Sequence, residues 1–319
     1  MIFGARYDRS AVALNRGWSY REQVGPQNSG QTVLAYLTAT RLHSTEQEWA
    51  ARLGRGEVEV EGTRVRGDAV VFAGQMVCWH RPPWDEAAVP THFDVIHEDE
   101  DILAVNKPSG LPTMPAGGYL DNTLLSLLRQ QYPEASALHR LGRHTSGVVL
   151  FARSKAAASS LARAWRERTV KKTYRTLALG STRAEMFVID VPIGPVPHPL
   201  LGTIEGAREG GKPSHSVAFA LEQRHDSTLF SVEITTGRPH QIRIHMAYAG
   251  HPLVGDPVYE MGGGLKHHPG LPGDGGYFLH AEKLQFTHPT TARPMTVTAT
   301  PPPELQTHAE LVRASVAAR

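Results

Sequence analysis

The sequence HRLGRHTSGVVLFARS, which runs from His139 to Ser154, is the most informative segment of the chain. Its first part is rich in Arg, His and Gly, and the apolar run from Val148 to Phe151 is typical of a buried strand. Polar side chains at such a junction between a loop and a strand lie at the rim of a sheet, where clefts form. Arginine suits phosphate recognition there, because its planar guanidinium matches phosphate oxygens. The segment therefore predicts a site for an anionic ligand.

Further segments of the same kind lie on both sides of it. They are VNKPSG from Val105 to Gly110, KKTY from Lys171 to Tyr174, TGRPHQIRIH from Thr236 to His245, GHPLVGDPVY from Gly250 to Tyr259, and FLHAEKLQFTHP from Phe278 to Pro289. In this order and at this spacing, the segments closely resemble the RluA-type family of RNA pseudouridine synthases. The resemblance covers about residues 93 to 300.

The resemblance implies an isomerase that needs no cofactor and no metal. Its substrate would be a uridine in structured ribosomal or transfer RNA, flipped out of its stack into a pocket. In the family an aspartate starts the reaction, a tyrosine stacks on the base, and a basic residue pairs with the aspartate. Tyr174 matches the stacking tyrosine, and Arg243 matches the basic partner.

The chain departs from the family at the aspartate. The family's segment reads HRLDR, whereas Gly142 stands at the aspartate position here. Because losing a nucleophile usually costs several powers of ten in rate, the standard route is in doubt. Three readings stay open: an active synthase that uses another group, such as the Asp121 segment or His144; an RNA-binding pseudoenzyme; or an engineered substitution. Asp256 matches a position that looks structural in the family.

A buried Arg243 without its partner would cost roughly 3–5 kcal/mol, so we expect it to find a replacement: another carboxylate, an RNA phosphate or water. We also expect basic side chains around the pocket to bind RNA phosphates. These predicted RNA-binding residues are Arg140, Arg143, Lys107, Arg238 and His240.

The pattern of strands and helices predicts an α+β catalytic domain over residues 90–319, with a central mixed, largely antiparallel sheet. Strands are expected at 93–96, 102–105, 148–151, 174–179, 186–191, 217–221 and 229–235, and helices at 154–168 and 239–248. Residues 1–30 are expected to form an N-terminal extension.

Residues 31–85 predict a small α/β module that weakly resembles the S4-like RNA-binding fold. Two short helices precede the alternating stretch from Glu57 to Glu61, which is typical of a half-buried strand, and a further strand is expected near 69–72. If the module binds RNA, its phosphate contacts would come from Arg41, Arg52, Arg55, Arg64 and Arg66. A packed module without RNA contact is the alternative.

The composition fits a cytoplasmic RNA-binding protein, which we expect to be a monomer. The 319 residues include 33 basic and 31 acidic ones, so RNA binding would depend on a local basic cleft. The single cysteine, Cys78, points to a reducing compartment, and neither a signal peptide nor a membrane span is expected. Gly25 to Thr32 resembles a phosphate loop but lacks its lysine, and the metalloprotease pattern HExxH and the hydrolase elbow GxSxG are missing.

Overall fold

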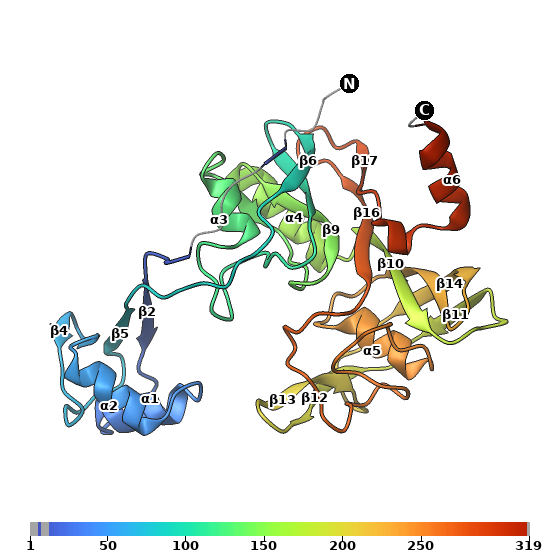
Figure 1. Ribbon diagram of the computed structural model, residues 1–319. Helices are drawn as coiled ribbons and strands as arrows, with labels where there is room; N and C mark the ends of the chain where they lie inside the picture. The colour runs from blue at the N-terminus through green and yellow to red at the C-terminus, as the bar shows by residue number, and fades with distance from the viewer. Residues whose placement is uncertain (1–5, 8–12, 318–319) are drawn as a thin grey trace. The chain divides into compact units, whose positions relative to one another are not determined.

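The computed structural model describes residues 6–7 and 13–317 and divides the chain into two compact units (Figure 1). The smaller unit spans Val12–Glu86, and the larger comprises Met1–Ala11 and Ala87–Arg319. The predicted N-terminal extension lies partly outside the described residues. Its described part is divided between the two units, so the predicted boundary at residue 30 is not the one observed. Among the described residues, no helix is both long and apolar enough to cross a membrane.

The smaller unit is a four-stranded antiparallel sheet covered by two helices. Its elements are β2 (Trp18–Gln23), the 3-10 turn η1 (Pro26–Asn28), α1 (Val33–Thr40), α2 (Glu46–Gly54), β3 (Val58–Val60), β4 (Thr63–Arg64) and β5 (Met76–Arg81), with strand order β2-β5-β3-β4. Thr45 caps α2 in a capping box with Glu48, and Trp49 lies fully buried at the centre of the core.

Two features of the smaller unit differ from the prediction. Strand β2 belongs to the unit although it lies before residue 31, because its backbone pairs with β5 along its whole length. The strand expected near 69–72 is reduced to a single bridge between Thr32 and Val70, and β5 takes the central place instead. The predicted strand at 57–61 is confirmed as β3.

The larger unit is built on an 11-stranded sheet, counted over the described residues, and the predicted α+β class is confirmed. Its main path runs β1-β6-β7-β9-β16-β10-β15-β14-β11, while β17 pairs with β16 and β8 with β9. The strands are β1 (Arg6–Tyr7), β6 (Phe93–Glu98), β7 (Ile102–Lys107), β8 (Ser136–Ala137), β9 (Ser146–Ala152), β10 (Lys171–Leu179), β11 (Met186–Ile189), β14 (Ser216–Gln223), β15 (Ser227–Ile234), β16 (Leu279–Thr287) and β17 (Pro294–Thr298).

Helices and one separate hairpin complete the larger unit. They are α3 (Leu124–Arg129), α4 (Lys155–Arg166), α5 (Gln241–Tyr248), η2 (Pro303–Leu305), α6 (His308–Ala317) and the hairpin β12 (Ile193–His198) with β13 (Gly202–Ala207). Apolar side chains of β7 alternate between two cores: Leu103 and Val105 pack with α3, whereas Ile102 and Ala104 pack with α4. Both faces of this part of the sheet are therefore covered, which explains the unbroken apolar runs of its strands.

The sheet consists of two antiparallel halves joined by one parallel pair, β9 with β16. Gly147 in β9 has a φ of +107°, and a Cβ added there would lie 2.2 Å from the carbonyl oxygen of Ala281 in β16. Only glycine fits this contact. Next to it, the Ser146 hydroxyl donates to Nδ1 of His280, whose Nε2 donates to the Ala299 carbonyl. The turn Thr145-Ser146-Gly147 therefore joins the two halves of the sheet.

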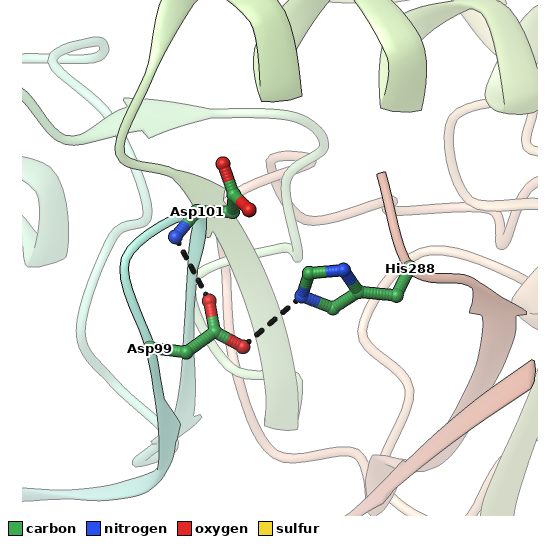
Figure 2. A group of neighbouring side chains, drawn as sticks. All are labelled: Asp99, Asp101 and His288. Carbon is green, nitrogen blue, oxygen red and sulfur yellow. Dashed lines mark hydrogen bonds and ion pairs between the residues drawn. The ribbon is translucent and has the colours of Figure 1, made fainter. Parts of the chain in front are cut away.

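The hairpin turn between β6 and β7 is held by the carboxylate of Asp99 (Figure 2). One of its oxygens accepts hydrogen bonds from the backbone N–H groups of Asp101 and Ile102, and the other accepts hydrogen bonds from the imidazoles of His97 and His288. Burial raises the pKa of Asp99, but these hydrogen bonds outweigh burial and lower it to about 2. Nδ1 of His288 accepts two further backbone N–H groups, so its Nε2 carries the proton given to Asp99. These hydrogen bonds to Asp99 stabilise the turn.

We expect Asp99→Asn to lower the free energy of unfolding by about 1–2 kcal/mol at neutral pH, because an amide has one acceptor oxygen and cannot accept from both the backbone pair and the imidazoles. The lowered pKa means that the native carboxylate stabilises the fold above its unfolded pKa of 3.8 and loses this effect as pH falls toward 2. Urea unfolding at pH 7 and pH 2.5 measures both states, and the gap between variant and wild type should shrink at the lower pH. A gap that is equal at both pH values would contradict this account.

Candidate active site

A pocket of about 220 Å³ opens in the larger unit beside the joint between the two half-sheets. At about 30 Å³ per water molecule, this is room for roughly seven waters. Loops and strands far apart in the sequence form its wall. The lining residues are Arg140, Leu141, Gly142, Thr145, Tyr174, Ile234, Gly237, Arg238, Pro239, His240, Gln241, Ile242, Arg243, Tyr277 and Leu279.

The loop that carries Gly142 is anchored on both sides. The Thr145 N–H donates to the Gly142 carbonyl, and Thr113 bonds both backbone groups of Leu141 through its hydroxyl. Gly142 itself is exposed to the pocket. A Cβ built on Gly142 would lie 3.2 Å from the hydroxyl of Tyr277 and 3.5 Å from that of Thr145. Hydroxyl groups therefore occupy the space in front of this position.

Lys107 supports the same loop from below, and the prediction that it contacts RNA is wrong. Its side chain is fully buried. The ammonium group donates to the carbonyls of Pro108, Leu111 and Arg143, which uses all three of its protons. Burial lowers the pKa of Lys107 to about 7, while the three carbonyls favour the charged form. Its role is to hold the VNKPSG turn against the Gly142 loop.

Tyr174 lies in the central strand β10, where β15 and β16 flank it on either side. A register shift next to it, between Thr173 and Tyr174, marks a bulge of the kind that often re-aims a side chain. The ring lines the pocket and is only 8% exposed. Burial raises the pKa of Tyr174 to about 12, so the phenol stays neutral at physiological pH. It provides an apolar ring face for a planar ligand.

Arg243 lines the pocket from α5, and its guanidinium forms an ion pair with Asp256. Nε and Nη2 each donate to one oxygen of Asp256 at 2.7 Å, and both residues are buried. Asp256 also accepts the N–H groups of Val258 and Tyr259. The third nitrogen, Nη1, has one long contact of 3.5 Å, to the Pro272 carbonyl. The expected replacement carboxylate is therefore present, but its hydrogen bonds tie it to the wall of the site.

The turn before α5 brings Arg238 and His240 to the pocket rim. Gln241 fixes this turn by accepting the Arg238 N–H and the Thr236 hydroxyl. His240 takes a left-handed φ of 57°, and the Tyr259 hydroxyl lies 2.8 Å from its Nδ1. Burial, aided by the nearby charge of Arg243, lowers the pKa of His240 to about 3, so it is neutral. It can exchange hydrogen bonds with a ligand but cannot supply charge.

Of the remaining predicted residues, one lines the pocket and one does not. Arg140 lines the pocket as expected. Arg143 is not among the lining residues, and its guanidinium donates to the Tyr119 hydroxyl and to the Gly273 carbonyl. Its predicted contact with RNA stays a prediction. Sequence reasoning missed Tyr277, which stands immediately before the FLHAEKLQFTHP segment and β16.

No carboxylate lines the pocket in the part of the chain that the structure describes. Asp121 and His144, the candidates for a substitute catalytic group, are absent from its wall. Glu134, the nearest carboxylate upstream of the loop, pairs with Arg153 instead. A substitute for the missing aspartate must therefore come from the hydroxyl groups and cations of the wall.

A second hollow, of about 490 Å³, adjoins the first and shares Arg140, Tyr174 and Arg238 with it. Its other cations are Arg166 and Arg168, at the end of α4, and Lys172. Burial, and then the nearby charge of Arg168, lowers the pKa of Lys172, as expected where like charges gather. No acidic residue lines this hollow among the described residues. We call it the basic hollow.

In the smaller unit, three of the arginines expected to contact phosphates are engaged internally. Arg41 pairs with Glu22, and Arg55 with Glu57. Arg52 lies over the rings of Trp49 and Trp79. Arg64 and Arg66 are exposed. A separate open hollow, which no sequence motif indicated, is lined by Arg16, Gly17, Trp18, Ser19, Arg21 and Arg81.

Comparisons with known proteins identify relatives of the chain. A model of the RNA pseudouridylate synthase family matches residues 101–248. The chain is 42% identical over 278 residues to an uncharacterized RNA pseudouridine synthase of Synechocystis, covering 86% of this chain and 96% of that protein. It is 33% identical over 293 residues to ribosomal large subunit pseudouridine synthase D of Neisseria meningitidis, covering 86% and 75%. The solved human RNA pseudouridylate synthase domain containing 1 matches with a TM-score of 0.52 at 28% identity, covering 70% of this chain and 95% of that one.

We expect Asp256→Asn to destabilise the fold by roughly 3–5 kcal/mol at pH 7, because it leaves the Arg243 charge buried without its partner. The matched control is Asp190→Asn, since the Asp190 side chain is 67% exposed in its pair with His215 and should contribute little. Chemical denaturation of both variants provides the comparison. Equal stabilities for the two variants would show that the Arg243–Asp256 pair contributes no more than a surface ion pair.

Proposed function

The chain belongs to the RluA-type family of RNA pseudouridine synthases, and we propose that it isomerises uridines in structured ribosomal or transfer RNA at the pocket beside Gly142. The observation that carries this proposal is that the Tyr174 ring and the Arg243 guanidinium line one pocket of about 220 Å³. A base held there would stack on the tyrosine, with the cation close to its sugar. A base can enter this pocket only after it has been flipped out of its stack.

The basic hollow supports RNA as the substrate. Arg140 and Arg238 belong to both hollows, so a nucleotide in the pocket would continue directly into a cationic surface. Guanidinium groups there can bind the phosphates that flank the flipped nucleotide. The overall charge of +2 would not attract RNA, and this local concentration of cations provides the attraction instead.

A second candidate function is RNA binding without isomerisation. The observation in its favour is that Gly142 has no side chain and that no carboxylate among the described residues lines the pocket. The two functions share every binding contact and differ only in whether a bond of the uridine is broken. We further propose that the protein acts as a monomer in the cytoplasm, since one chain supplies both Tyr174 and Arg243.

Purified protein incubated with unmodified ribosomal and transfer RNA transcripts should convert uridine to pseudouridine, measured as tritium released from C5-labelled uridine. Tyr174→Ala should lower this rate by about 10²-fold or more, because the base loses the ring on which it stacks. Tyr248→Phe, on the exposed end of α5, is the control and should keep the wild-type rate. RNA binding without tritium release, followed by release in Gly142→Asp, would favour the binding-only function.

The basic hollow makes a separate prediction about salt. Affinity for RNA falls as salt rises, and each phosphate contact to a single strand contributes about 0.7 to the steepness of log affinity against log salt. Replacing both Arg166 and Arg168 with alanine should therefore make this slope shallower by about 1.4. Arg163→Ala is the control, because Arg163 lies on α4 outside both hollows. Fluorescence anisotropy with labelled RNA at several salt concentrations gives the slopes. An unchanged slope in the double variant would remove the basic hollow from the RNA path.

A further inference from the structure

The hydroxyl of Tyr277 occupies the space in front of Gly142. It lies 3.2 Å from where a Cβ of residue 142 would be and 3.5 Å from the Thr145 hydroxyl, and its ring lines the pocket. A contact of 3.2 Å is tighter than most real Cβ contacts, so the phenol would have to shift by a few tenths of an ångström to admit an aspartate at 142. The short residue at 142 and the large one at 277 are therefore complementary: one vacates the space that the other fills.

The backbone before Tyr277 holds it in this place. A Cβ on Gly275 would lie 2.4 Å from the ring of His144, and Gly276 takes a φ of +111° beside Gly255. Both positions need glycine, because side chains would push the strand away from the Gly142 loop. After Tyr277 the chain enters β16, whose pairing with β9 is fixed by Gly147. The position of the ring is thus set by close packing on both sides.

The same ring lies against the positive charge of the site. The Arg243 guanidinium carbon is 4.3 Å from the centre of the Tyr277 ring, in a cation–π contact. Negative charge developing on the phenolic oxygen would be stabilised by this buried cation. Burial raises the pKa of the other tyrosine of the pocket, Tyr174, to about 12. Of the pocket's two phenols, Tyr277 has the cation as its neighbour.

We propose that Tyr277 is the nucleophile that replaces the missing aspartate in the isomerisation of uridine. Tyrosine is a known covalent nucleophile, and certain glycosidases use it at the anomeric carbon of a sugar, the same kind of atom as C1′ of uridine. The inference rests on the proposed function, since it assigns a group to that reaction. It explains why Gly142 leaves the pocket without a carboxylate while Arg243 and Tyr174 keep their places.

The reaction balances without any co-reactant. In the first step, the Tyr277 oxygen bonds to C1′, the C1′–N1 bond breaks, and the phenolic proton passes to the departing uracil, which leaves with an N1–H. The freed uracil then rotates on the Tyr174 ring. In the second step, C5 bonds to C1′, the C1′–O bond to Tyr277 breaks, and the proton lost from C5 returns to the phenolic oxygen. Nothing is oxidised or reduced.

The test compares Tyr277→Phe with the wild-type chain on the same RNA transcripts. Phenylalanine keeps the ring and its contact with Arg243, so the variant should fold and should bind RNA within about threefold of the wild-type Kd. Tritium release from C5 should fall by about 10³-fold or more, as expected for loss of a nucleophile. Intact mass spectrometry of acid-quenched reactions should detect an RNA adduct on the wild-type protein, mapped to Tyr277, and none on the variant. Tyr248→Phe is the control and should match the wild type.

The possible results separate the inference from the proposed function. If the wild-type chain binds RNA but releases no tritium, the isomerase function fails and the inference fails with it. If the wild-type chain is active and Tyr277→Phe retains its rate within threefold, only the inference is overturned. A variant that loses affinity as much as rate would also overturn it, because the hydroxyl would then be a binding contact.

Discussion

The architecture depends on the contact between the backbones of Gly147 and Ala281, which leaves no room for a side chain. This contact joins β9 and β16 as the parallel pair between two otherwise antiparallel halves. It places the end of the Gly142 loop beside the start of β16, and Tyr277 lies just before that strand. Strand β16 in turn pairs with β10, which carries Tyr174. One short distance therefore brings three separate segments to the same pocket. A methyl group at residue 147 would separate the halves and open the site.

A second constraint is the buried charge of Arg243. Two of its nitrogens are bound by Asp256, whose oxygens are bound in turn by the backbone of the GDPVY turn. Burial raises the pKa of Asp256, but Arg243 and the backbone N–H groups outweigh burial and lower it, so the pair is charged at neutral pH. The guanidinium is thus fixed in orientation before any ligand arrives. Sites that stabilise developing charge work best when their dipoles and charges are already in place.

Much of the fold and part of the site could be predicted from the sequence. Strands β7 and β9 were predictable because their unbroken apolar runs are bounded by turns. Tyr174 and Arg243 were predictable because they stand in recognisable motifs. Lys107 was misassigned because sequence shows that a residue is cationic, but not whether backbone carbonyls surround it. Tyr277 escaped notice because its position depends on two glycines packing against distant loops. Strand β2 was missed because its residues are mostly exposed, so that only pairing with β5 reveals it.

The smaller unit interrupts the larger one between two neighbouring strands. The chain leaves the catalytic sheet after β1 and returns to it at β6, and these two strands pair with each other. The exit and entry points of the inserted unit are thus one strand spacing apart, about 4.8 Å. A tight hairpin of two to five residues could bridge that gap in place of the whole unit. The smaller unit is therefore an inserted domain, and its removal or exchange would leave the order and pairing of the strands in the catalytic sheet unchanged.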